Sequence, residues 1–242
     1  MARYHKRGFR REQPPPIPMT ASATTTTFRL GLIVLTLAVI PRSAAGQQRN
    51  INFDLLVAAR AGKETAVRAL LDQGANPDSR DRVGDTPLNI AARTGHPAMA
   101  KLLVERGANV NLGNLAQVTP LMSAAFGGHV EIVKILLESK ADVAPVDRVH
   151  KTAMIYAAGG GSAECVELLL DAGIDVNTRY ANNGTALMWA AAYGKVETVK
   201  RLLARGADVV ARDDRGKTAL AIAMEQGHAE VTSVLRAAGA RE

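Results

Sequence analysis

The 242-residue sequence predicts an all-α solenoid of about six helix-turn-helix units that are joined by hairpin-like fingers. The first observation is a period of 33 residues after residue 50, marked by the threonines Thr86, Thr119, Thr152, Thr185 and Thr218. The second is a set of three residue ladders that keep this register without an insertion. They are Ala58, Ala91, Ala124, Ala157, Ala190 and Ala223; Gly62, Gly95, Gly128, Gly161, Gly194 and Gly227; and Leu70, Leu103, Leu136, Leu169, Leu202 and Leu235. A fixed period of this length is typical of stacked supersecondary units.

The unit that begins at Thr119 shows why each repeat contains two short helices. Its threonine can cap a helix N-terminus through the hydroxyl, and Pro120 follows at the first helical position, where a missing N–H costs nothing. The pair Gly127 and Gly128 ends that helix. The second helix carries apolar residues at helical spacing: Ile132, Val133, Ile135, Leu136 and Leu137.

Glycines also follow the second helix, where the chain needs a left-handed residue. They are Gly74, Gly107, Gly173 and Gly206, and Lys140 takes their place in one unit. We expect strain of about 1 kcal/mol at Lys140. About nine residues then lead to the next threonine, which is enough for an extended finger.

These units resemble the ankyrin repeat. The segments Thr86-Pro87-Leu88 and Thr119-Pro120-Leu121 match the opening of its T-P-L-H motif, Gly95-His96 and Gly128-His129 match its middle, and residues 107–111 match its G-A-D-V-N end. The resemblance covers residues 50–240, with repeats starting near residues 50, 83, 116, 149, 182 and 215. No unit has the histidine of T-P-L-H, which in the family helps to tie neighbouring fingers together. The residues at that position are Asn89, Met122, Ile155, Met188 and Ala221.

The first 46 residues have the pattern of a secretory signal peptide. Basic and proline-rich residues precede an apolar run over residues 30–40, and small residues follow it before Gln47. A membrane-spanning helix needs about 20 apolar residues, so we expect cleavage near Ala45 or Gly46 and no permanent membrane span. Met19 is an alternative start. The expected location is therefore the periplasm or the exterior, with residues 47–242 as the repeat domain.

The net charge of +7 comes from the same N-terminal region. Residues 1–49 contain 8 of the 30 Lys and Arg residues and 1 of the 23 acidic residues, so the remainder has 22 of each. A neutral repeat domain gives no reason to expect nucleic-acid binding.

We expect no catalytic residue, metal site or cofactor in the repeats. Cys165 occupies a position that Ile132 and Val231 hold in other units, which favours a small buried side chain. The Gly-His histidines His96, His129 and His228 lie a repeat or more apart, which favours a structural hydrogen bond at the start of each second helix. The run Gly159-Gly160-Gly161 joins two helices and is interpreted as a loose turn.

The resemblance implies that a protein partner binds on the concave side, over the finger tips and the first helix of each unit. The residues predicted to contact it are Arg80, Arg82, Arg93, Phe126, Arg148 and Tyr193. For Tyr156 and Trp189, which share a position with Ile90 and Ile222, core packing is the expectation. The predicted function is an exported, monomeric, non-catalytic scaffold for protein binding. Two alternatives stay open: a membrane-tethered adaptor that retains residues 30–40, and an enzyme whose site lies within the scaffold.

Overall fold

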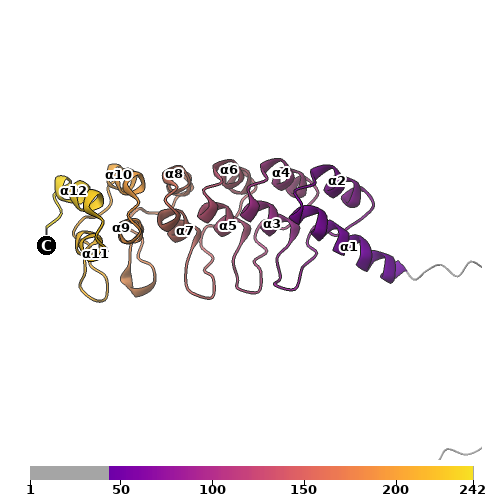
Figure 1. The fold of residues 1–242 in the computed structure, drawn as a ribbon, viewed down its shortest axis with the longest axis horizontal. Coiled ribbons are helices and arrows are strands. Elements are labelled where there is room, and N and C mark those ends of the chain that lie inside the picture. The colour runs from indigo at the N-terminus through magenta and orange to yellow at the C-terminus, as the bar shows by residue number, and fades with distance from the viewer. Residues whose placement is uncertain (1–43, 242) are drawn as a thin grey trace, which may run out of the picture. The chain divides into compact units, whose positions relative to one another are not determined.

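The computed structural model describes residues 44–241, and this part of the chain folds into twelve α-helices and one short 3-10 helix, without a β-strand (Figure 1). The predicted all-α class is confirmed. The predicted signal peptide and Met19 lie outside the described residues, except that Ala44, Ala45 and Gly46 form the start of the first helix.

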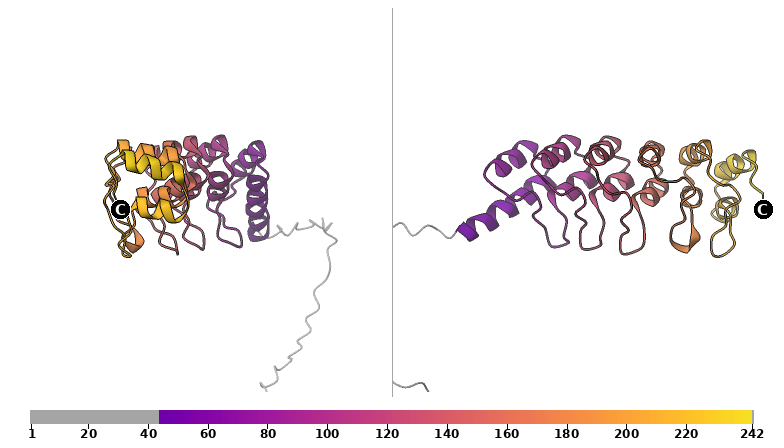
Figure 2. Two further views of the ribbon diagram at one scale, coloured as in Figure 1. Left: turned by 60° about the vertical axis from the view of Figure 1, so that its left-hand side comes forward. Right: turned by 180° about the vertical axis from the view of Figure 1, so that it is seen from behind.

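The helices form two rows, with the fingers projecting beyond one of them (Figures 1 and 2). The first helices of the units are α1 (Ala44–Arg60), α3 (Pro87–Thr94), α5 (Pro120–Gly127), α7 (Ala153–Gly160), α9 (Ala186–Ala192) and α11 (Ala219–Glu225). The second helices are α2 (Glu64–Asp72), α4 (Pro97–Glu105), α6 (Val130–Glu138), α8 (Ala163–Asp171), α10 (Val196–Ala204) and α12 (Ala229–Ala237). The 3-10 helix η1 (Ala181–Asn183) lies in the fourth finger.

A buried threonine starts each of the helices α3, α5, α7, α9 and α11. At α3, the Thr86 hydroxyl oxygen accepts a hydrogen bond of 3.1 Å from the backbone N–H of Asn89. The Asn89 side chain accepts one of 3.0 Å from the Thr86 N–H in return. The hydroxyl oxygens of the other four threonines accept equivalent bonds from backbone N–H groups, which fixes where each first helix begins, as the sequence predicts.

The core is a continuous layer that each unit shares with its neighbours. The alanine ladder on the first helices is fully buried from Ala91 to Ala223, so these helices can approach one another closely. The leucine ladder on the second helices is equally buried from Leu103 to Leu235, whereas Leu70 at the N-terminal end is only partly buried. Stability therefore depends on contact between neighbouring units.

The Gly-His histidines bridge neighbouring units. Nε2 of His228 lies 3.1 Å from the carbonyl oxygen of Ala192 in the preceding unit, and Nε2 of His129 lies 3.4 Å from that of Arg93. A carbonyl oxygen can only accept, so the ring N–H donates. A Cβ at Gly95 would lie 2.6 Å from the ring of His129, and one at Gly194 would lie 2.7 Å from the ring of His228, so the glycine of one unit leaves room for the bridging imidazole of the next. The expected structural role of these histidines is confirmed.

Each finger is a tight turn that is tied to its neighbours. In the first finger, Asp81 N–H donates to the Asp85 carbonyl at 3.1 Å, and the Asp81 carboxylate accepts from the Asp85 N–H at 2.9 Å. The next finger adds a bond of 3.0 Å from Leu115 N–H to the Val83 carbonyl. Asn89 also donates its side-chain amide to the Val118 carbonyl at 3.3 Å, so in one unit it links a helix to the next finger without the family's histidine.

Thr198 provides the first test of core packing. Its hydroxyl is fully buried in α10 and has no hydrogen-bond partner among the described residues. The equivalent positions of other units hold Ile132, Cys165 and Val231, so a methyl group fits there. We expect Thr198→Val to raise the free energy of unfolding by about 1–2 kcal/mol, measured by urea denaturation, because an unsatisfied buried hydroxyl is removed without a change of shape.

The matched control for this change is Thr232→Val. The Thr232 hydroxyl in α12 donates to the His228 carbonyl at 3.0 Å, so its replacement should give no gain. Equal effects at the two threonines would contradict the explanation.

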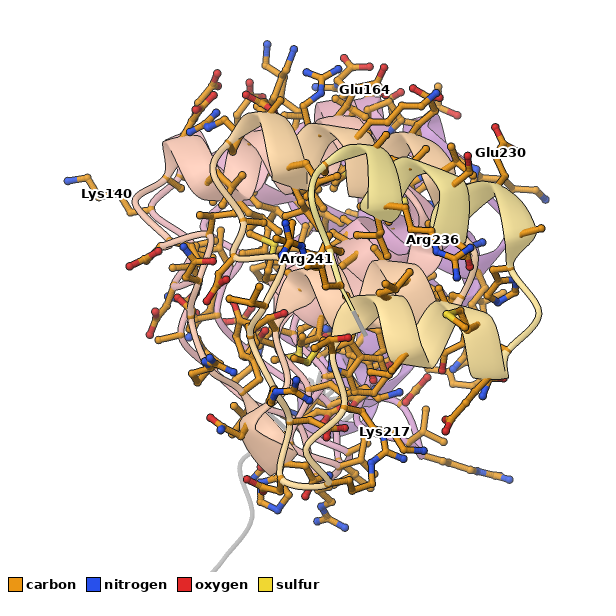
Figure 3. The ribbon with its side chains drawn as sticks, turned by 90° about the vertical axis from the view of Figure 1, so that its left-hand side faces the viewer. Lys140, Glu164, Lys217, Glu230, Arg236 and Arg241 are labelled. Atoms are coloured by element: carbon orange, nitrogen blue, oxygen red, sulfur yellow. The ribbon has the colours of Figure 1, made fainter. Side chains whose placement is uncertain are left out.

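Lys140 tests the strain predicted at the end of α6. Its φ is +61°, in the left-handed region, and its side chain projects away from the fold (Figure 3). We expect Lys140→Gly to raise the free energy of unfolding by about 1 kcal/mol, measured by urea denaturation, because glycine adopts this conformation without strain.

The reverse change, Gly206→Lys, should lower stability by a similar amount. Gly206 has φ +84°, and a Cβ built there meets no atom within 4 Å, so backbone strain alone would act. A Gly206→Lys protein with the same free energy of unfolding as the parent protein would contradict the explanation.

Candidate functional site

We use the term inner face for the surface formed by the fingers and by the first helices α3, α5, α7, α9 and α11. It corresponds to the concave side of the sequence prediction. Four aromatic residues gather on it from three consecutive first helices. They line a cavity of about 240 Å³, here called the aromatic groove, which consists of Phe126, Lys151, Ile155, Tyr156, Gly159, Gly160, Trp189 and Tyr193.

The four rings form two walls. Phe126, at the end of α5, meets Tyr156 of α7 edge to face, with ring centroids 5.7 Å apart. Trp189 of α9 is stacked on Tyr193, with centroids 6.1 Å apart. Phe126 is 64% exposed and Tyr193 is 52% exposed, so each wall presents a large apolar surface to solvent. Such surface on one face of a protein is typical of an interaction site.

The floor between these walls is glycine. Gly159 and Gly160 are the last residues of α7, and Gly161 is its left-handed cap with φ +90°. The interpretation of this run as a loose turn is therefore wrong. A Cβ at Gly160 would lie 2.8 Å from the Phe126 carbonyl oxygen, so only glycine permits this approach of α5. Because neither residue has a side chain, the groove stays open down to the helix backbone.

Lys151 is the cation of the groove. Its Nζ lies 4.9 Å from the Trp189 ring centroid and 5.6 Å from that of Tyr156, close enough for cation–π attraction to both rings. Among residues 51–241, no carboxylate forms an ion pair with it. The nearby Asp147 carboxylate is already engaged, since it accepts from the Lys151 N–H at 2.8 Å and from the Tyr156 hydroxyl at 2.5 Å.

The Tyr156 hydroxyl fixes one wall of the groove. Burial and the Asp147 carboxylate, which accepts a hydrogen bond from the phenol, together raise the pKa of Tyr156 to about 12. The phenol therefore stays protonated near neutral pH and continues to donate to Asp147, which holds the ring in place.

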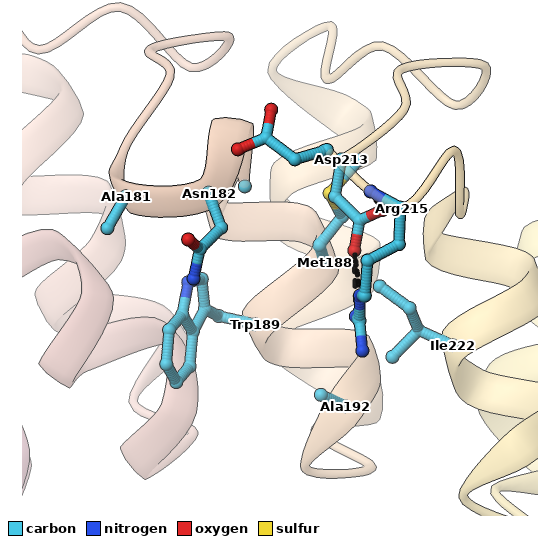
Figure 4. A pocket seen from close by; sticks show the side chains of 10 residues that line it. Ala181, Asn182, Met188, Trp189, Ala192, Asp213, Arg215 and Ile222 are labelled. Atoms are coloured by element: carbon cyan, nitrogen blue, oxygen red, sulfur yellow. Dashed lines mark hydrogen bonds and ion pairs between the residues drawn. The ribbon is translucent and has the colours of Figure 1, made fainter.

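A second cavity of about 480 Å³ adjoins the groove at Trp189, which lines both (Figure 4). It lies between the unit of α9 and the unit of α11. It is lined by Ala181, Asn182, Gly184, Met188, Trp189, Ala192, Asp213, Asp214, Arg215 and Ile222. The fourth finger differs from the others here. Tyr180 replaces the aspartate or asparagine that forms the turn in the other fingers, and η1 follows it with φ +55° at Asn182.

The six predicted contact residues fall into separate parts of the inner face. Phe126 and Tyr193 are brought together in the aromatic groove. Arg80 and Arg82 line a different cavity, of about 950 Å³, at the first finger. All four arginines are exposed.

The other two arginines lie apart from that cavity as well. Arg93 lies in α3, with its guanidinium 3.3 Å from the buried carboxylate of Asp85. Arg148 lies at the tip of the third finger, where its N–H donates to the Ala116 carbonyl at 3.0 Å. The four arginines thus lie between the first finger and the third, and the aromatic residues of the groove lie on α5, α7 and α9.

Sequence reasoning missed three residues of the groove. Tyr156 and Trp189 pack against the core but are only half-buried, because their rings extend beyond the space that Ile90 and Ile222 fill at the same position. The sequence places Lys151 on the concave surface by its position in the repeat but does not select it as a contact, because its importance depends on the rings beside it. An available signal was the coincidence of four aromatic residues and three glycines within three consecutive repeats.

Other chemistry finds little support in the part of the chain that the structure describes. Cys165 is fully buried, as predicted, and burial raises the pKa of its thiol. Between residues 44 and 241, no three His, Cys, Asp or Glu side chains come together as metal ligands would. None of the described helices combines the length and apolar character that a membrane-spanning segment needs.

The titration of Tyr156 can be tested directly. Burial raises the pKa values of both Tyr156 and Tyr180 to about 12, whereas an unfolded tyrosine titrates near pH 10. The folded state therefore holds these protons more tightly, and stability is lost as the pH rises from about 10 to about 12. We expect Tyr156→Phe to flatten this loss in urea denaturation and to remove one late-titrating tyrosine from the ultraviolet absorbance titration. Unchanged profiles would contradict the burial of this hydroxyl.

Comparison with known proteins agrees with the repeat geometry. A family model described as ankyrin repeats (3 copies) matches residues 55–147, 113–180 and 154–241. No curated protein matches the sequence. Among solved structures, the chain is similar to EF0377, an ankyrin repeat protein, with 32% identity and a TM-score of 0.68 over 76% of this chain and 97% of that one.

It is also similar to the human ASB11 ankyrin repeat domain, with 33% identity and a TM-score of 0.72 over 77% of this chain and 84% of that one. The sequence period, the paired helices and these similarities agree, and the chain belongs to the ankyrin-repeat family.

Proposed function

We propose that the chain is a non-catalytic scaffold that binds a protein partner on its inner face, with the aromatic groove at the centre of the contact. Ankyrin repeats are in general protein-interaction modules, which supports the class of function. The observation that carries the choice of surface is the exposure of Phe126 and Tyr193 on either side of a glycine floor. Aromatic residues commonly dominate the energy of protein interfaces.

Stacking leaves few other surfaces free for this role. The alanine and leucine ladders are buried between units, so they cannot also contact a partner. The fingers add exposed apolar tips at Val83, Leu115 and Val149. Together with Arg80, Arg82, Arg93 and Arg148, these side chains favour a partner whose surface has an apolar centre and acidic surroundings.

The central test is truncation of the groove walls. We expect Phe126→Ala and Tyr193→Ala each to weaken binding of a partner recovered by pull-down by at least about 1 kcal/mol, because each removes a large apolar surface from the contact. Isothermal titration calorimetry would measure the affinity. Urea denaturation should change little, since both side chains are exposed in the free protein.

Val57→Ala is the matched control, because Val57 is 45% exposed on α1 and lines neither the groove nor the cavity at Arg80 and Arg82. Lys134→Glu on the outer helix α6 is the control for charge. Normal binding by both groove variants, with loss of binding by either control, would place the contact elsewhere.

We also propose that the chain is exported by the signal peptide expected at residues 1–46. The support is the residue pattern alone: a basic start, a short apolar run and small residues before Gln47. The repeat domain would then act in the periplasm or outside the cell, and the expected oligomeric state is a monomer.

N-terminal sequencing of protein from the native host tests this proposal. We expect the mature chain to begin between Ala45 and Gln48, because small residues at this point suit signal cleavage. Membrane-bound protein that retains residues 30–40 would favour the tethered alternative, and cytosolic protein that starts at Met1 would overturn export.

A further inference from the structure

The inner face repeats an internal ion pair between the last residue of a finger and the residue eight positions later on the first helix. In the first full unit, Asp85 pairs with Arg93 at 3.3 Å. In the last unit, Lys217 pairs with Glu225 at 2.5 Å. The two pairs have opposite orientation but the same positions in the repeat, so this geometry brings the two side chains together wherever both are charged.

The unit that contains α7 has only one member of this pair. Lys151 occupies the position of Lys217, and Gly159 occupies the position of Glu225. The carboxylate that pairs with Lys217 therefore has no counterpart at position 159, and among residues 51–241 Nζ of Lys151 lies over the Tyr156 and Trp189 rings instead. The residues that line the groove include no acid. Its aromatic rings lower the local dielectric constant around the ammonium, which strengthens the attraction of a carboxylate that enters the groove.

Resting on the proposed function, we infer that the partner supplies this missing carboxylate. The aromatic groove would accept an extended internal segment of the partner that carries an aspartate or glutamate next to an aromatic or large aliphatic side chain. The carboxylate would pair with Lys151 above Gly159, and the apolar side chain would lie between Phe126 and Tyr193. A carboxylate at this point replaces the interaction that Glu225 makes with Lys217 in the last unit.

The size of the groove favours a side chain over a small-molecule ligand. Its volume of about 240 Å³ falls below the range of about 300–1,000 Å³ that is typical of small-molecule sites. The walls are open to solvent, as the exposure of Phe126 and Tyr193 shows. A single apolar side chain can therefore enter the groove from its solvent-exposed side without a change in the backbone.

The neighbouring cavity favours an internal segment over a chain terminus. It shares Trp189 with the groove, so a segment bound in the groove can extend past this residue toward it. Among residues 51–241, the Trp189 indole N–H has no hydrogen-bond acceptor, and a carbonyl of such a segment would provide one. Capture of a terminal carboxylate commonly uses a nest of backbone N–H groups, whereas Lys151 offers a single side-chain charge.

The probe is a library of random 12-residue peptides displayed with both ends fused, selected on the immobilised full chain. Any carboxylate in this library comes from a side chain. We expect the selected peptides to carry Asp or Glu within two residues of Phe, Tyr, Trp or Leu. Trp189 is the only tryptophan, so its fluorescence reports occupancy of the groove. Selection of peptides without an acid would overturn the inference, as would binders that come only from a second library with free C-termini.

The decisive variant is Gly159→Glu, with Gly159→Gln as its neutral match. A Cβ at Gly159 would lie 3.5 Å from the Tyr193 ring, an ordinary contact, so the position accepts a Cβ, and the two side chains, nearly equal in size, differ in charge. Glutamate restores the internal pair with Lys151 and competes with the peptide, whereas glutamine fills the same space without charge. We expect Gly159→Glu to lower affinity at least about 10-fold relative to Gly159→Gln. Equal affinities for the two variants would overturn the inference.

A charge cycle on the lysine provides independent support. Lys151→Met and the Asp→Asn or Glu→Gln change in the peptide should each cost about 10-fold in affinity, and together little more than either alone. Lys217→Met is the matched control, because Lys217 already has Glu225, and it should leave affinity unchanged. Additive losses would contradict direct pairing.

The failure of this inference can be distinguished from the failure of the proposed function. If affinity depends on Phe126 but not on Lys151 or Gly159→Glu, the inference fails while the proposed function stands. If Phe126→Ala and Tyr193→Ala bind normally, the proposed function itself fails.

Discussion

Close contact between neighbouring first helices is the constraint on which the rest of this structure depends. The helices approach through alanines that are fully buried from Ala91 to Ala223. A larger side chain at any of these positions would push two units apart, and the hydrogen bonds that link their fingers would be lost with the contact. The same spacing fixes the threonine caps and the Gly-His bridges in register, so one period controls helix starts, turns and core together.

This constraint also separates the positions that stacking determines from the positions that it leaves free. Alanines and leucines recur because they touch the next unit, whereas the position of Arg93 holds Phe126, Gly159, Ala192 and Glu225 in the following units. Side chains at that position lie on the inner face, and Arg93, Phe126 and Glu225 are exposed there. Comparison within the chain therefore identifies a missing partner: Lys217 has Glu225, but Lys151 faces a glycine. Such a comparison is possible because each unit places equivalent residues in equivalent surroundings.

The sequence predicts the fold almost completely, because local signals and long-range packing share one period. The threonine caps, the glycine turns and the strain at Lys140 all follow from position in the repeat. It predicts less of the site. Phe126 and Tyr193 could be identified as exposed, but Tyr156 and Trp189 were assigned to the core, since period alone does not show how far a ring extends past its neighbours. The cation–π contacts of Lys151 depend on how the fold brings the two rings next to it, and the spacing of residues along the sequence does not indicate them.

The two glycines in the floor of the groove have different physical explanations. Packing requires Gly160, because a Cβ there would lie 2.8 Å from a backbone oxygen of α5. Gly159 has no such requirement, since its Cβ would make an ordinary contact of 3.5 Å with the Tyr193 ring. A glycine within a helix costs about 0.5–1 kcal/mol relative to alanine, and here it also leaves Lys151 without the acid found at Glu225. A residue that weakens its own helix and opens a charged, aromatic groove is the kind of local exception that marks a functional surface.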